Sequence, residues 1–117
     1  MNYLLLIYAN EAEMMRIGET ALKKMTGEYM DFTKSIVQAG NFKAGDRLKP
    51  VSSASTVRVR NGKTTITDGP FAETREQLGG YYLIEAKNLD EATAIAARIP
   101  GAQTGSIEVR PVWPPMT

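Results

Sequence analysis

The residues best suited to chemistry lie in one short segment, Thr67-Asp68-Gly69-Pro70-Phe71-Ala72-Glu73. Asp68 ends a strand-like run. It is followed by a glycine, which tolerates φ angles that other residues avoid, and by a proline, whose φ is fixed near about −65°. This pair is expected to end the strand and hold the carboxylate in a defined place. The carboxylate would then either fix the turn by accepting backbone N–H groups or act as a general base in a ligand site. The sequence leaves both roles open.

Histidine and cysteine are both absent from the 117 residues, which limits the available chemistry. Thiol nucleophiles and disulfides are excluded, and the commonest general base and metal ligand is missing. Acid–base chemistry would therefore come from Asp, Glu, Lys or Tyr side chains. We predict no metal site and no cofactor. Glu73 is the second candidate catalytic acid after Asp68, because it lies five positions further on, across a tight bend.

Five further side chains are candidates for binding a ligand. The tyrosines could direct hydroxyl groups into a pocket, and the arginines could bind a substrate carboxylate through two parallel hydrogen bonds. Each candidate also has a plainer interpretation: core packing for the tyrosines, anchoring of a loop for the phenylalanine, and ion pairing for the arginines. The candidates are Tyr8, Arg47, Phe71, Tyr81 and Arg110.

The charge pattern narrows the classes of partner. The chain has 14 Lys plus Arg residues against 13 Asp plus Glu residues, without a run of like charge. This balance argues against nucleic acid and against a membrane surface as partners. The apolar residues 3–8 follow no basic segment and are too few for a signal peptide or a membrane span. We therefore expect a cytoplasmic protein with a single domain over residues 1–117.

Helices and strands that would position the candidates can be read from the spacing of apolar residues. From Met15 to Ala39 they recur three and four positions apart, which indicates a helix with one core-facing stripe and a break near Gly18. Asn88 and Glu91 have the spacing of a capping box, and Pro100 would stop the helix that they open. Strands are predicted at residues 2–8, 42–48, 55–60, 63–68, 80–86 and 107–111.

The clearest local prediction is a β-hairpin. Asn61-Gly62 is the two-residue sequence that favours a type I′ turn between strands. This turn would place Ser55 opposite Asp68. Since side chains alternate along a strand, Asp68 would then share a face with Val57, Val59 and Ile66. A carboxylate on an apolar face is unusual for a residue that only forms a turn.

The order of elements predicts an α+β fold, with a mostly antiparallel sheet and helices on one face. Residues 3–8 and 81–86 carry largely apolar side chains on both faces of their strands, whereas the two helices can cover only one face. A second copy of the chain is the simplest cover for the other, which predicts a homodimer.

Four segments resemble the YCII-related, or DGPF, family: residues 3–8, 56–60, 67–82 and 106–112. The resemblance implies a ferredoxin-like fold, usually paired as a dimeric α/β barrel, in bacterial proteins whose biochemical role is mostly unassigned. Some members lie beside, or are fused to, extracytoplasmic-function sigma factors. A His–Asp pair has been proposed as catalytic in the wider family. This chain matches the aspartate but has no histidine.

Two functions follow as hypotheses. The first is a small-molecule-binding protein or enzyme, with a cleft around Asp68 in an α/β-barrel homodimer. The alternative is a non-catalytic regulatory or interaction module linked to sigma-factor-dependent transcription. The sequence leaves open whether the protein is an enzyme.

Overall fold

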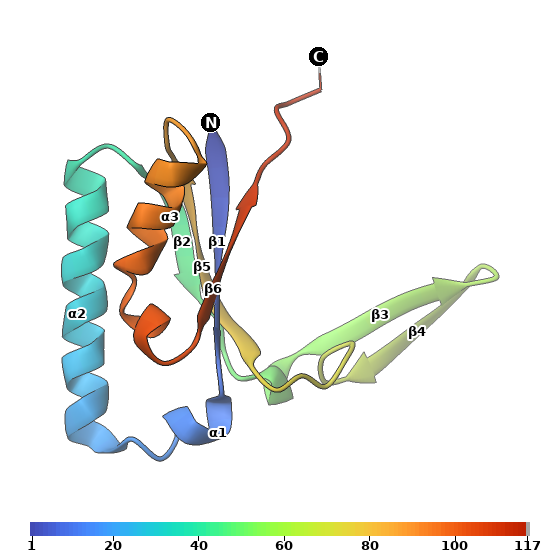
Figure 1. Cartoon of the computed structure of the whole chain (residues 1–117). Coiled ribbons are helices and arrows are strands. Elements are labelled where there is room, and N and C mark those ends of the chain that lie inside the picture. Colours follow the sequence, from blue (N-terminus) through green and yellow to red (C-terminus); the bar gives the residue numbers. More distant parts are fainter. Residues whose placement is uncertain (117) are drawn as a thin grey trace.

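The computed structural model describes residues 1–116 and has an α+β architecture (Figure 1). The main sheet has four strands in the order β2-β5-β1-β6, β3 and β4 form a separate hairpin, and neither sheet closes into a barrel within the described residues. All neighbouring strands are antiparallel, which confirms the predicted mostly antiparallel sheet. The strands are β1 (Asn2–Ala9), β2 (Phe42–Arg47), β3 (Ser55–Arg60), β4 (Lys63–Asp68), β5 (Gln77–Glu85) and β6 (Ser106–Pro111). The helices are α1 (Glu11–Met14), α2 (Gly18–Gln38) and α3 (Leu89–Ala97), with short 3₁₀ helices η1 (Val51–Ser53) and η2 (Pro100–Gln103).

The core lies between the main sheet and the two longer helices, α2 and α3, which cover one face of the sheet (Figure 1). Side chains alternate along β1, so Tyr3 and Leu5 point into this core and are buried, whereas Leu4 and Leu6 point to the other face. We call that other face, which no described helix covers, the open face. The buried apolar residues are Tyr3, Leu5, Phe32, Ile36, Tyr82, Ile84, Ala86, Ala92, Ile95, Ala96 and Ile99.

The predicted apolar stripe of α2 belongs to the core only in its second half. Phe32 and Ile36 are buried, but Met15 is 78% exposed and Leu22 is 40% exposed, so their assignment to the core was wrong. The 21 residues of α2 span about 31 Å, and the eight residues of β1 span about 26 Å, so the first turns of α2 have little sheet to pack against. The break near Gly18 is confirmed: α1 ends at Met14, and Gly18 has a left-handed φ of +85°.

The helix α3 begins as predicted from Asn88 and Glu91. The Asn88 side chain accepts a hydrogen bond from the Glu91 N–H at 2.9 Å, and α3 ends at Ala97, before Pro100. β5 is longer than predicted and begins at Gln77, and its pairing with β1 is irregular between Ile7 and Tyr8. No helix among residues 1–116 is both long enough and apolar enough to cross a membrane.

Tyr29 connects α2 to the segment after α3. Its hydroxyl accepts a hydrogen bond from the N–H of the buried Gly101 at 3.1 Å. A Cβ at position 101 would lie only 2.6 Å from the Tyr29 hydroxyl oxygen, so the two elements meet closely here. Because replacing Tyr29 with phenylalanine leaves this N–H unpaired, we expect Tyr29→Phe to lower the free energy of unfolding by about 1–2 kcal/mol.

The pH dependence of the free energy of unfolding gives a second measure of the contact between Tyr29 and Gly101. Burial raises the pKa of Tyr29 above its usual value of 10.0. The folded state therefore holds the phenolic proton more tightly than the unfolded state. This stabilisation is fully present below about pH 10 and is lost as the pH rises through the folded-state pKa. Urea unfolding at neutral and alkaline pH should show a shallower alkaline loss for Tyr29→Phe than for the wild type, with the exposed Met30→Leu as a control that behaves like wild type.

Candidate functional site

Asp68 ends β4 at the base of the hairpin and lies opposite Ser55, as the turn predicts. Asn61 and Gly62 have φ angles of 53° and 74°, the left-handed values that a type I′ turn requires. The pairing of Val57 with Ile66 also follows the prediction. The sequence therefore predicted the register of the whole hairpin, including the face on which Asp68 lies. We call this hairpin, residues 55–68, the arm.

The corner after Asp68 is held by groups other than its carboxylate. The Gly69 N–H donates to the Ala54 carbonyl oxygen at 2.7 Å, and the Thr56 Oγ1 donates to the Gly69 carbonyl oxygen at 2.8 Å. Gly69 has a φ of +96°, which favours glycine. The Asp68 side chain is exposed, and within residues 1–116 its carboxylate makes no hydrogen bond or ion pair that would fix the turn. The carboxylate is thus available to an external group.

The apolar face that Asp68 shares is exposed in the single chain. The side chains of Val57, Val59 and Ile66 are 60%, 56% and 68% exposed, and Phe71 beyond the corner is 78% exposed. Figure 1 shows the arm projecting from the body, with only its base close to the other elements. The described residues of one chain therefore form no cleft around Asp68. A cleft would need a second molecule.

The open face of the main sheet has an apolar centre. Leu4 pairs with Leu83, and Leu6 pairs with Tyr81, so these side chains lie together on adjacent central strands. All four are only partly buried although no described helix lies over them. Tyr8 follows Leu6 on the same face of β1. The prediction that both faces of the central strands are apolar is confirmed, and only one of them is covered.

Polar pairs flank this apolar centre. The Tyr81 hydroxyl donates to Asp46 Oδ2 at 2.8 Å, across from β5 to β2. The hydrogen bond to Asp46, followed by the charge of the same carboxylate, raises the pKa of Tyr81 above its usual value. On the opposite side, Arg110 and Glu108 form an ion pair on β6. An apolar centre with a polar rim is typical of a protein–protein interface.

The predicted site residues fall into separate groups. Tyr8, Tyr81 and Arg110 lie on the open face. Arg47 pairs with Gly80, and paired residues of antiparallel strands share a face. Gly80 lies on the helix-facing side of β5, as does the buried Tyr82. The exposed side chain of Arg47 is therefore directed to the helix side of the sheet and not to the open face. Asp68, Phe71 and Glu73 are exposed at the base of the arm and in the loop that follows it. One chain does not bring these seven residues into a single cluster.

Sequence reasoning missed a polar network that fastens the base of the arm to the body. The Gln77 Oε1 accepts a hydrogen bond from the Glu11 N–H at 3.0 Å, and the Glu11 Oε2 accepts one from the Val51 N–H at 3.1 Å. The Ser106 Oγ donates to Glu76 Oε1 at 2.8 Å. These partners are 30 to 66 positions apart in the sequence, so no local motif could have indicated them. The network holds η1, which precedes the arm, and the start of β5, which follows the loop after the arm.

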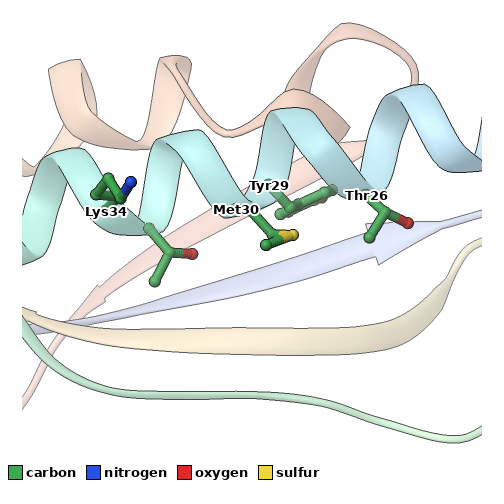
Figure 2. Close-up of a pocket in the computed structure, with 5 residues that line it drawn as sticks. Thr26, Tyr29, Met30 and Lys34 are labelled. Carbon is green, nitrogen blue, oxygen red and sulfur yellow. The ribbon is translucent and has the colours of Figure 1, made fainter.

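A groove of about 430 Å³ lies away from all of these residues, along α2 (Figure 2). It is lined by Thr26, Tyr29, Met30, Thr33 and Lys34, all from one helix, and it is wide open to solvent. None of the predicted site residues lines it. Because its walls come from a single helix and leave it wide open to solvent, we place the candidate site elsewhere. Among the described residues, no three acidic side chains gather in a way that could hold a metal ion.

A comparison with known protein families identifies the family of this chain. A model of the YCII-related domain matches residues 1–116. The chain belongs to the YCII-related family. A protein of Rhizobium meliloti (strain 1021), described as uncharacterized, is 38% identical to it over 114 residues, which cover 96% of this chain and 92% of that relative. The family predicted from the four matching segments is thus confirmed, and this relative's description assigns no activity.

Proposed function

We propose that this YCII-related protein acts as a homodimer that binds a small molecule around Asp68. The open face is the observation that supports the dimer. Its apolar centre consists of Leu4, Leu6 and Leu83, polar pairs flank this centre, and no described helix covers the face. A second copy presents the same face, so the two sheets can pack together around a twofold axis.

The arrangement of strands and helices supports a specific form of this dimer. The order β2-β5-β1-β6, with α2 and α3 on one side, matches a ferredoxin-like sheet into which the arm is inserted between β2 and β5. Two such sheets packed through their open faces would give the dimeric α/β barrel that the family resemblance implies. We place the protein in the bacterial cytoplasm.

The exposed corner after Asp68 supports the ligand site. Backbone hydrogen bonds of Gly69 hold the corner, the Asp68 carboxylate is free, and Phe71 offers an exposed ring three positions further on. A carboxylate beside an aromatic ring suits a ligand that carries N–H or O–H donors or a positive charge. In an enzyme, Asp68 would act as a general base with Glu73 as the second acid, and Tyr8, Tyr81 and Arg110 would orient the ligand from the open face.

The ligand site is tested by replacing Asp68 with asparagine. A panel of amines, guanidines and polyols is screened for an increase in melting temperature of the wild-type protein. We expect Asp68→Asn to abolish the increase while changing the melting temperature of the free protein by less than about 2 °C, because the exposed carboxylate supports no other group. Glu28→Gln, an exposed carboxylate on α2, should respond as wild type does. A variant that is destabilised by several degrees and still binds would assign Asp68 a structural role.

The alternative is a regulatory or interaction module linked to sigma-factor-dependent transcription, without catalysis. The absence of histidine favours it, because the catalytic pair proposed for the wider family is incomplete. It predicts that tagged protein, expressed in a host bacterium, recovers a sigma factor and that no compound of the panel raises the melting temperature.

A further inference from the structure

The arm has one apolar and one cationic face. Residues paired across an antiparallel hairpin share a face, so Val57, Val59 and Ile66 lie together on one side. The other side presents three positive charges and no aliphatic side chain. It consists of Thr56, Arg58, Arg60, Lys63, Thr65 and Thr67. This period-2 alternation is typical of a strand pair with one buried face.

The body of the same chain does not bury that face. The Cα radius of gyration is 16.3 Å, against about 13 Å for a compact domain of this length, because the arm extends into solvent. A two-stranded hairpin on its own is at best marginally stable in water. The regular pairing of the arm over all six positions of each strand is therefore expected to depend on a surface that covers the apolar face.

A second copy of the chain is the occupant that the arrangement favours. Figure 1 shows the arm extending from the main sheet on the side opposite α2 and α3, which is the side of the open face. A copy seated on the open face would thus lie beside the arm. The chain has two uncovered apolar surfaces, the arm and the open face, and one twofold partner can cover both.

We propose that the arm clasps the partner protomer through Val57, Val59 and Ile66, and that the two arms do so reciprocally; this inference rests on the homodimer proposed above. Asp68 lies on the same face of the arm. The clasp therefore brings the Asp68 carboxylate of one protomer against the body of the other. The ligand site is then built by two chains, which accounts for the absence of a cleft around Asp68 in one.

Hydrogen–deuterium exchange of the full chain tests the clasp. Wild-type protein is measured above and below the concentration at which light scattering reports half-dissociation. We expect the amides of residues 55–68 to exchange at least about tenfold more slowly in the dimer than in the monomer, because the covered hairpin opens less often. The doubly substituted variant Val57→Thr/Ile66→Thr keeps β-branched residues but places hydroxyls on the apolar face, and it should lose this slowing. The matched control Arg58→Thr/Lys63→Thr alters the opposite face and should retain it.

The outcomes separate the clasp from the dimer itself. A wild-type dimer whose arm exchanges as fast as in the monomer, or an apolar-face variant that behaves like its control, would overturn the clasp and leave the sheet-to-sheet dimer intact. A wild-type protein that is monomeric at every concentration would overturn both.

Cross-linking determines which chain the arm contacts. Lys63 lies beside the turn at the tip of the arm. Equal amounts of ¹⁴N- and ¹⁵N-labelled chain are mixed, allowed to exchange and treated with a short amine-reactive cross-linker. We expect cross-linked peptides from Lys63 to contain one light and one heavy chain. Lys63 peptides that join only residues of the same chain would show that the arm folds back on its own body, against the proposal.

Discussion

Replacing Leu5 with alanine is expected to lower the free energy of unfolding by about 3 kcal/mol, within the range of about 2–5 kcal/mol found for buried leucines. Leu5 is fully buried at the centre of β1, among side chains of the sheet, α2 and α3. Its removal leaves a cavity that these regular elements cannot easily fill. For a chain of this length the melting temperature should fall by roughly 10–15 °C.

The measurement is urea unfolding followed by circular dichroism at a fixed protomer concentration, because unfolding of a dimer depends on concentration. Leu22→Ala is the matched control: it makes the same chemical change on α2, where the side chain is partly exposed. We expect it to cost less than about 1 kcal/mol. Equal losses from the two variants would show that the face of β1 covered by the helices is not the main core.

Replacing Leu6 with aspartate is expected to weaken dimerisation by at least about 100-fold, which corresponds to about 2.7 kcal/mol. Leu6 follows Leu5 on β1 but points to the open face, where it pairs with Tyr81 and Glu108. In a sheet-to-sheet dimer the twofold axis would place two new carboxylates in an apolar interface. Unpaired buried charges are costly, and like charges repel.

Sedimentation equilibrium of the wild type and the variant measures this effect. The far-ultraviolet circular dichroism of Leu6→Asp should match that of the wild type, because one chain tolerates a polar group on its uncovered face. Leu22→Asp introduces the same charge on α2 and should leave the dissociation constant unchanged within about threefold. If Leu6→Asp dimerises as the wild type does, the open face is not the interface and the proposed barrel is wrong.

Much of the local structure could be predicted from the sequence. The register of the arm followed from Asn61-Gly62, since a two-residue turn determines which residues face each other. The start of α3 followed from the spacing of Asn88 and Glu91, and the break before α2 from Gly18. These features depend on neighbouring residues alone, so the tertiary structure has little opportunity to change them.

The predictions about burial succeeded less well, because burial depends on which elements lie beside each other. Met15 follows the apolar spacing of the helix stripe but lies in the break between α1 and α2, where its side chain is exposed. Asp68 is on the predicted apolar face, yet that face is exposed because the whole arm leaves the body. Arg47 and Tyr81 both lie on strands of the main sheet and are directed to opposite sides of it.

The sequence by itself determined the family, through the four segments that resemble it, and the face on which Asp68 lies, because motifs and a period-2 alternation are properties of continuous segments. It also predicted two apolar faces on the central strands. Only the tertiary structure decided that the arm projects from the body and that the polar network of Glu11 and Gln77 holds its base. The physical reason is distance along the chain: these arrangements join residues 40 or more positions apart, and their packing is specified by the fold as a whole.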